Sequence, residues 1–578
     1  MVLKRLESLV AAALPLIDLT LAHDPDSAGG RLCAIKGRLF EATKMHMWDT
    51  MIRLTQDRKG EIPAVTLYRG AAAHHLGRAT GQRGSGGGGG GGSVMRQLYK
   101  ALADVPLLRS KSKGKGMMAW QVSFVGEGGD DYGGLFRESI RELAADLQQP
   151  QPHPTALFLV SPNFRATAGA TSGREAYVPN PWVCVRGSPG QRAHFRQQFA
   201  FLGKVMGAGL RTSNPLGLDL PLLVWKRFLR EDVTVDDLAD CDERFVRALQ
   251  TIRTCDDAAA WAALPASSAA MLVGCCRSST PASTSASLPP PAPQRGRGPW
   301  APAPVCSEEE GVLVWTVRSS CGIIFDLVPG GGSKPVAQEE REAFAAAALA
   351  WRLSEFDAAL DAMRHGLGQN VPIQMLPLLT PQELMVRLCG EDEVDLEVLR
   401  GIVRNKLDAA DAESVMAWLW QTLEGFSNEE RKQFLGFVWG RERLPRDTCG
   451  LQLEVRTQGA HGDAHLPSSH TCFNALDIPR YSSQQVLEEK LRYAIAHCKA
   501  IDTDFAARTP LSDEPPADLT PISPTHQDSA CGADGFAGDA AGALGQGGAA
   551  GGDYGGQSAE SLGLTSELDT GDIPCRLQ

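Results

Sequence analysis

The stretch that decides the fold reads Leu466-Pro467-Ser468-Ser469-His470-Thr471-Cys472-Phe473-Asn474-Ala475-Leu476-Asp477-Ile478-Pro479-Arg480-Tyr481-Ser482-Ser483. Two prolines bracket a short run whose apolar residues favour a strand. Ser482 and Gln485 then form a capping-box pattern ahead of apolar residues at helical spacing. The pattern therefore places one cysteine, Cys472, between a loop and a strand that leads into an amphipathic helix.

Composition alone favours an ordinary role for Cys472, because a free cysteine is usually a small buried hydrophobe. The residues around it change this interpretation. The pattern Leu-Pro-x-x-His-Thr-Cys-Phe-Asn-x-Leu-x-x-Pro-x-Tyr-Ser-Ser resembles the active-site segment of the HECT-type ubiquitin-protein ligases. The resemblance implies that Cys472 carries ubiquitin as a thioester and that the reaction needs no cofactor.

Length and composition narrow the class of protein. A chain of 578 residues can form more than one core, and its net charge of -11 argues against a nucleic-acid partner. The fourteen cysteines lack Cys-x-x-Cys spacing, so we expect no metal site, and we expect reduced thiols in a cytoplasmic or nuclear compartment. No apolar run reaches the roughly 18 residues that a membrane span needs, so we expect no membrane insertion.

Other segments extend the resemblance over about residues 120–505. They are Trp120–Gly134, Leu157–Asn163, Phe199–Gly207, Leu384–Gly390 and Phe434–Gly440. Within or beside them we expect a strand at Val122 and Phe124, close helix packing at Gly203 and Gly207, and capping boxes of Thr380 with Glu383 and of Ser427 with Glu430. The glycine-rich loop in the first of them could be read as a phosphate cradle, but no Gly-Lys-Ser/Thr follows and its acidic residues would repel phosphate. We expect these acidic residues to cap and position the loop instead. The resemblance implies an α+β fold with two lobes. A large, mainly helical N-lobe carries a small subdomain that docks the conjugating enzyme, and a smaller α/β C-lobe carries the catalytic cysteine.

The domain organisation follows from composition and resemblance together. We predict a helical segment over residues 1–80, similar to the one that precedes the domain in the large propeller-bearing HECT ligases, and a glycine-rich linker over 81–93. The N-lobe would span 94–395, with a disordered insertion at 256–310, and the C-lobe 396–508. A disordered acidic tail would follow at 509–578. The insertion and the tail carry too little apolar surface to offset their ordering entropy.

Residues beside Cys472 are the next candidates. In an extended segment His470 would point to the same side as Cys472, so it could relay protons or simply position the loop. Thr471 is a catalytic candidate as well, and with Asn474 it could hold the loop through hydrogen bonds. Asp477 could orient the incoming lysine amine.

More distant candidates come from the resemblance. A helix predicted over residues 343–367 would present an apolar stripe to the conjugating enzyme, although core packing explains such a stripe equally well. The stripe consists of Phe356, Leu360, Met363 and Leu367. The family carries a phenylalanine near its C-terminus that assists transfer to lysine, and here Ile501 and Phe505 are the candidates. The hinge between the lobes should lie near Glu391 to Leu399.

The predicted function is that of a ubiquitin-protein ligase. Its partners would be a ubiquitin-conjugating enzyme, ubiquitin and an unknown protein substrate. Two alternatives stay open. One is a scaffold that docks partners without transfer; the other is a cysteine hydrolase such as a deubiquitinase, in which Cys472 would pair with His461, His465 or His470. All three histidines precede the cysteine, and the sequence context of known cysteine nucleophile families is missing.

Overall fold

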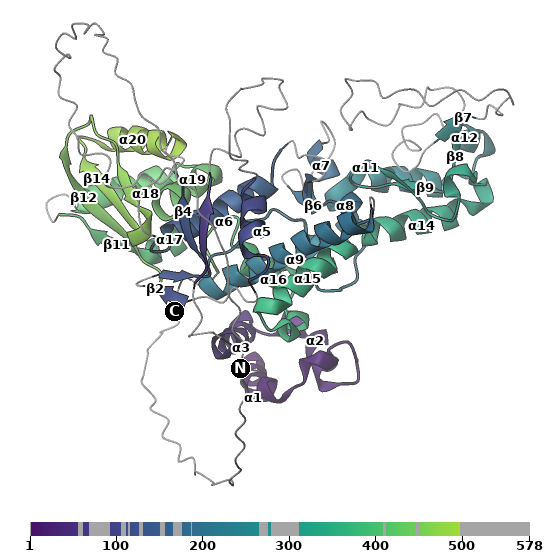
Figure 1. Ribbon diagram of the computed structural model, residues 1–578, viewed down its shortest axis with the longest axis horizontal. Coiled ribbons are helices and arrows are strands. Elements are labelled where there is room, and N and C mark those ends of the chain that lie inside the picture. The colour runs from purple at the N-terminus through teal and green to yellow at the C-terminus, as the bar shows by residue number, and fades with distance from the viewer. Residues whose placement is uncertain are drawn as a thin grey trace, which may run out of the picture. The chain divides into compact units, whose positions relative to one another are not determined.

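A computed structural model describes residues 2–55, 62–68, 93–105, 111–113, 116–125, 131–150, 156–165, 176–185, 188–264, 276–278, 311–408, 412–446, 448 and 450–497. This part of the chain is α+β, with long helices and six small sheets (Figure 1). Among its helices, none combines the length and apolarity that crossing a bilayer requires. The predicted tail, Ile501, Phe505 and most of the predicted linker lie outside the described residues.

The N-terminal segment is only partly helical. It contains α1 (Val2–Ala13), α2 (Ala28–Ala34) and α3 (Glu41–Leu54), followed by the strand β1 (Ala64–Leu67). This strand pairs in parallel with β4 (Gln121–Phe124), which was expected as a strand, whereas β1 was not. Apolar residues from α1 to β1 belong to the same hydrophobic cluster as residues up to Cys389, which we call the first core. The segment is therefore part of that core rather than a separate unit.

Two long helices run side by side through the first core, α9 (Pro189–Thr212) and α15 (Asp357–Asn370) (Figure 1). Glycine makes this contact possible. A Cβ on Gly203 would lie 1.8 Å from the Met363 carbonyl oxygen, and one on Gly366 would lie 1.7 Å from that of Ala200. The expectation that Gly203 allows close packing against a neighbour is confirmed.

The prediction that this apolar stripe forms a docking surface is wrong. Its members are each 3% exposed or less: Phe356 2%, Leu360 3%, Met363 0% and Leu367 0%. They belong to the first core because α15 packs against α9. The helix expected over 343–367 is also two helices, α14 (Arg341–Ser354) and α15. Near the break Arg352 pairs with Glu355 at 3.0 Å, both withdrawn from solvent.

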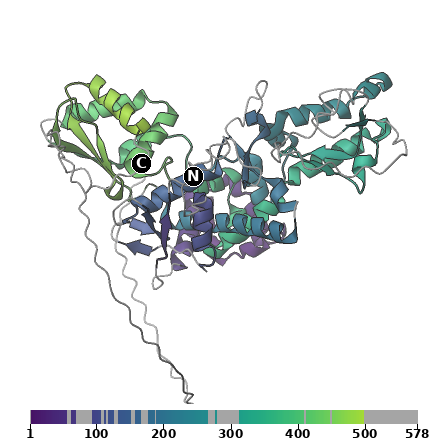
Figure 2. The same cartoon turned by 45° about the horizontal axis from the view of Figure 1, so that its top comes forward.

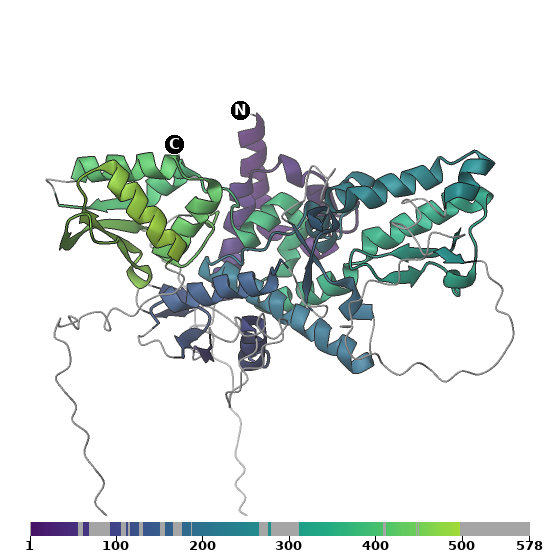
Figure 3. The same cartoon turned by 90° about the horizontal axis from the view of Figure 1, so that it is seen from above.

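A group of elements beyond this helix pair contains α11 (Val235–Arg253), α12 (Ala258–Ala263), α14 and the strands β8 (Gly311–Leu313), β9 (Thr316–Arg318) and β10 (Ile324–Asp326) (Figure 3). The prediction of disorder from residue 256 is wrong at the start of the insertion. Asp257 caps α12 by accepting a 2.8 Å bond from the Ala260 amide, and Leu264 is buried. Within the insertion, β7 (Cys276–Ser278) pairs with β8.

Further helices and strands complete the first core. They are α5 (Val94–Leu102), α6 (Gly134–Leu147), β5 (Phe158–Val160), α7 (Pro162–Arg165), β6 (Tyr177–Pro179), α8 (Pro181–Val185), α10 (Leu222–Phe228) and α16 (Pro381–Cys389), with the hairpin β2 (Lys111–Lys113) and β3 (Gly116–Met118) beside them. Helix α16 begins with the predicted capping box, Thr380 with Glu383.

A second hydrophobic cluster, the second core, begins at Val394. Its four-stranded sheet has the order β11 (Val403–Lys406), β12 (Leu453–His461), β14 (Ala475–Arg480) and β13 (Ser468–His470). The first three strands are parallel and β13 is antiparallel to β14. The helices gathered beside this sheet are α17 (Leu396–Ile402), α18 (Ala412–Glu424), α19 (Asn428–Trp439) and α20 (Gln484–His497) (Figure 2).

Two helix caps can be compared with the capping boxes predicted from the sequence. The box of Ser427 and Glu430 at α19 is confirmed. At α20 the predicted cap is displaced by one residue, because Ser483 accepts from the Val486 amide whereas the Ser482 hydroxyl donates to Asp463.

The chain passes from the first core to the second through four residues, 390–393. Gly390 has a φ of 80°, and the Glu391 amide donates to the Leu444 carbonyl at 3.0 Å. The range predicted for a hinge, Glu391 to Leu399, extends beyond this connection, since Leu399 lies in α17 and is buried in the second core.

Candidate active site

Cys472 lies on a tight turn between two antiparallel strands. Strand β13 ends at His470, residues Thr471–Phe473 form a single 3-10 turn, and Asn474 ends it with a left-handed φ of 51°. The Cys472 side chain is partly exposed, and Phe473 beside it is 58% exposed. Because this turn is not extended, the expected alternation of side chains does not apply to His470 and Cys472.

His470 and Asp477 pair across the two strands. The His470 Nε2 atom lies 3.1 Å from the Asp477 Oδ2 atom, and both side chains are about one quarter exposed or less. The bond fixes the imidazole against the strand that follows the turn. It favours the loop-positioning interpretation of His470. A role of Asp477 in orienting an amine stays a prediction.

Thr471 is 4% exposed and holds the turn through its carbonyl oxygen, which accepts from the Asn474 amide at 3.3 Å. Among the described residues its buried hydroxyl has no hydrogen-bond partner. The predicted loop-holding role therefore belongs to the backbone of Thr471 and to the side chain of Asn474, whose partner comes from the first core.

The first turn of α6 lies against the Cys472 turn. A Cβ on Gly134 would lie 2.7 Å from the Cys472 sulfur and 2.9 Å from the Thr471 hydroxyl oxygen, so a glycine is needed for this approach. The start of α6 is fixed by Asp131, which accepts from the Gly133 amide at 2.7 Å and from the Val122 amide at 2.9 Å. Burial raises the pKa of Asp131, and these bonds oppose the rise. The expectation that an acidic residue positions this loop is confirmed for Asp131.

Arg137, one turn into α6, is a site residue that sequence reasoning missed. Its guanidinium donates to the Trp439 carbonyl at 3.0 Å, to the Thr471 carbonyl and to the Asn474 Oδ1 atom at 3.2 Å. Withdrawal from water lowers the pKa of Arg137 to about 10, and the charges of Cys472 and Asp131 act against this. The residue lies within the Trp120–Leu147 region, but nothing in the sequence says that this helix faces a turn more than three hundred residues away.

Five other described cysteines have thiols that burial makes less acidic. Burial raises the pKa of Cys33, Cys241 and Cys321, that of Cys184 to about 11 and that of Cys389 to about 12. Such thiols stay protonated at neutral pH, and the thiolate is the reactive form. Cys255 is partly exposed like Cys472, and its sulfur lies 3.9 Å from the Asp257 carbonyl oxygen.

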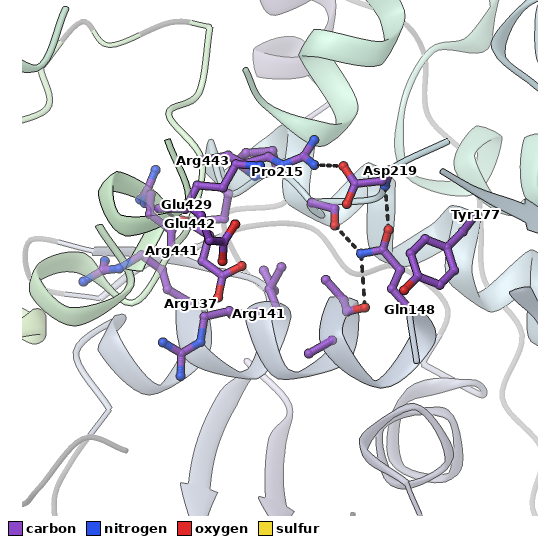
Figure 4. Close-up of a pocket in the computed structure, with 16 residues that line it drawn as sticks. Arg137, Arg141, Gln148, Tyr177, Pro215, Asp219, Glu429, Arg441, Glu442 and Arg443 are labelled. Atoms are coloured by element: carbon purple, nitrogen blue, oxygen red, sulfur yellow. Dashed lines mark hydrogen bonds and ion pairs between the residues drawn. The ribbon is translucent and has the colours of Figure 1, made fainter. Parts of the chain in front are cut away.

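A pocket of about 270 Å³ is lined in part by Arg137 (Figure 4). Its walls come from α6, from residues 214–219 and from residues 429–443, so both cores contribute to it. Arg443 pairs with Asp219, and the Gln148 amide group bonds to the Asp219 amide at 2.6 Å and to the Gly217 carbonyl at 2.8 Å. The pocket lining mixes both charges and does not include Cys472. Within the described residues no group of histidine, cysteine and acidic side chains is arranged to hold a metal ion.

Comparison with known proteins identifies the family of the chain. The family model described as HECT-domain (ubiquitin-transferase) matches residues 152–503, and the chain belongs to this family. It is similar to the E3 ubiquitin-protein ligase HERC2 of Mus musculus, with 35% identity over 425 residues, which are 73% of this chain and 7% of that protein. HERC2 of Homo sapiens is 35% identical over 69% of the chain and 7% of its own length.

A more distant relative is the probable E3 ubiquitin-protein ligase HECTD4 of Homo sapiens, 25% identical over 83% of this chain and 11% of that protein. The chain thus spans about one fourteenth of the length of the HERC2 proteins that it matches.

Proposed function

We propose that this protein is a ubiquitin-protein ligase that accepts ubiquitin from a conjugating enzyme as a thioester on Cys472 and passes it to a lysine of a protein substrate. The observation that carries the proposal is the position of Cys472 in a chain of this family. It lies on a partly exposed turn, against Gly134 of α6, in the segment that resembles the family's active site. The first and second cores would be the N-lobe and the C-lobe.

The chemistry uses only groups of this protein, of the conjugating enzyme, of ubiquitin and of the substrate lysine. In loading, the Cys472 thiolate attacks the thioester carbonyl carbon, a new C–S bond forms, and the cysteine of the conjugating enzyme leaves as a thiolate. In transfer, a neutral lysine amine attacks the same carbon and the Cys472 thiolate leaves with the bonding electron pair. The amine proton passes to solvent. The first step exchanges one thioester for another, and the second forms a more stable amide.

One cysteine must meet two different partners in turn, so the two cores must change their relative position during the cycle. Residues 390–393 are the proposed hinge. The conjugating enzyme would dock on the elements α11, α12, α14 and β8–β10, through side chains other than the buried stripe of α15. The protein would act in the cytoplasm or the nucleus, where thiols stay reduced.

The proposal is tested by incubating residues 1–509 with activating enzyme, a panel of conjugating enzymes and ubiquitin. A ligase gives a ubiquitin adduct that reductant removes. A scaffold gives no adduct with any enzyme of the panel although it binds one of them. A hydrolase gives free ubiquitin from a ubiquitin conjugate without a stable adduct. Either of the last two results would refute the proposal.

A further inference from the structure

Arg137 connects the first core to the turn that carries Cys472. One guanidinium bonds to the Trp439 carbonyl, the Thr471 carbonyl and the Asn474 side chain. The Thr471 carbonyl belongs to the peptide bond that precedes Cys472, and Asn474 closes the turn in its left-handed conformation. Trp439 is the last residue of α19, where a cation interacts favourably with the helix dipole. All three bonds join α6 to the second core.

We propose that Arg137 is a positioning residue for the transfer step: from α6 it fixes the turn of Cys472 at the moment when the cysteine sulfur leaves the ubiquitin carbonyl. This inference rests on the proposed function. It adds that the arrangement of the two cores in this structure serves the transfer step, with Arg137 as the residue that fixes it. The acceptor is a lysine amine. The bond that breaks is the C–S bond to Cys472, the bond that forms is C–N, the electron pair stays on sulfur, and the amine proton passes to solvent.

The charge on the Cys472 sulfur develops differently in the two steps. This difference assigns the Arg137 contact to transfer rather than to loading. Negative charge develops on the Cys472 sulfur when it is the leaving group, and a cation and the first amides of a helix stabilise such charge. When Cys472 is the attacking group, the same environment stabilises the thiolate before it reacts and lowers its nucleophilicity. An arrangement of the cores that brings Arg137 to this turn therefore suits the second step.

Gly134 adds an independent observation. Its neighbours leave no room for a Cβ, because the Cys472 sulfur and the Thr471 hydroxyl oxygen lie within 3 Å of the position that it would occupy. Gly134 is the first residue of α6, and its φ is not in the left-handed region. Alanine at this position is therefore compatible with the helix itself and obstructs only the approach of the turn.

The experiment separates the two steps. Wild type, Arg137→Gln, Arg137→Lys, Gly134→Ala and the control Arg31→Gln are compared. Arg31 is an exposed arginine of α2 that lies 3.9 Å from a partner that is also exposed, Asp26, and it belongs neither to the site nor to the proposed docking elements. Loading is followed as a single turnover from a charged conjugating enzyme. Transfer is followed by chasing purified Cys472-linked ubiquitin with free lysine and with a protein acceptor.

We expect Arg137→Gln to slow the chase about 10- to 100-fold, since charge-assisted bonds are lost, and to leave loading within about twofold. Gly134→Ala should give the same selective loss, with a melting temperature no lower than that of wild type. Arg137→Lys should restore part of the rate because it keeps the charge but not the three bonds. Arg31→Gln should match wild type.

Three results would overturn the inference. Equal losses in both steps for Arg137→Gln, with a lower melting temperature, would mean a purely structural role. Faster loading of Arg137→Gln with an unchanged chase would mean that the Arg137 contact inhibits loading. An unchanged chase in both Arg137→Gln and Gly134→Ala would mean that the pose is not used. Failure of the wild type to load would instead count against the proposed function.

Discussion

Replacing Lys44 by methionine should destabilise the first core although Lys44 lies more than four hundred residues from Cys472. The Lys44 side chain is fully buried, and its Nζ atom lies 2.5 Å from Glu383 Oε1 and 3.0 Å from the Lys36 carbonyl oxygen. Glu383 is 15% exposed and also completes the capping box of α16 with Thr380. Methionine has a similar shape but no charge, so Glu383 would be left as a partly buried carboxylate without its cation.

Removing one partner of such a buried ion pair lowers the free energy of unfolding by about 3–5 kcal/mol. Since Glu383 keeps some contact with solvent, we expect about 3 kcal/mol for Lys44→Met. The double variant Lys44→Met/Glu383→Gln should recover at least half of this loss, because the uncompensated charge is gone and a glutamine can still accept the capping bond. The matched control is Arg31→Met, whose 3.9 Å pair with Asp26 is exposed and should contribute about 0–1 kcal/mol.

The assay is urea unfolding of residues 1–509, followed by tryptophan fluorescence; the fully buried Trp48 lies in α3. The transition of the first core should shift to lower urea in Lys44→Met and remain near wild type in Arg31→Met. A loss below about 0.5 kcal/mol for Lys44→Met would refute the reasoning. It would mean that the N-terminal segment is not coupled to the first core through this pair.

Three further predictions concern packing, reactivity and the turn. Gly366→Ala should destabilise the first core by about 3 kcal/mol or more in urea unfolding, because its Cβ would meet a carbonyl oxygen of α9 at 1.7 Å; a loss under 1 kcal/mol would contradict the packing. Iodoacetamide at pH 8 should label Cys472 well before Cys184, whose pKa is raised to about 11 by burial, and mass spectrometry showing Cys184 labelled first would oppose this. Asp477→Ala should release His470 and slow loading and transfer alike, by about 3- to 10-fold for the loss of one bond, whereas a change in one step alone would favour a direct role for the carboxylate.

Local patterns in the sequence were sufficient for much of the fold. Capping boxes at Thr380 and Ser427 and the strand at β4 are decided by residues close together in the chain. The parallel partner of β4 was missed because β1 is short and its pairing depends on a distant segment. Prediction of the α15 stripe failed for a related reason: an apolar face has the same pattern whether a partner or another helix of the same chain covers it.

The site was predictable in its central residue and not in its surroundings. The segment around Cys472 identifies the cysteine by resemblance, whereas the 3-10 turn changes the direction of its side chain relative to His470. Arg137 and Gly134 could not be assigned to the site from sequence, since their role depends on how the first and second cores meet. Contacts between cores leave no periodic pattern in either segment, because each involves single residues on unrelated elements.

The central claim is that Cys472 carries ubiquitin, and the most direct measurement is the chemical nature of the adduct in Cys472→Ser, Cys472→Ala and Cys255→Ala. Cys255 is the matched control because it is also partly exposed. Wild type and Cys255→Ala should form a ubiquitin adduct that reductant removes. Cys472→Ser should form an adduct that resists reductant and is cleaved by hydroxide. Cys472→Ala should form no adduct. A reductant-sensitive adduct on Cys472→Ala would contradict the account.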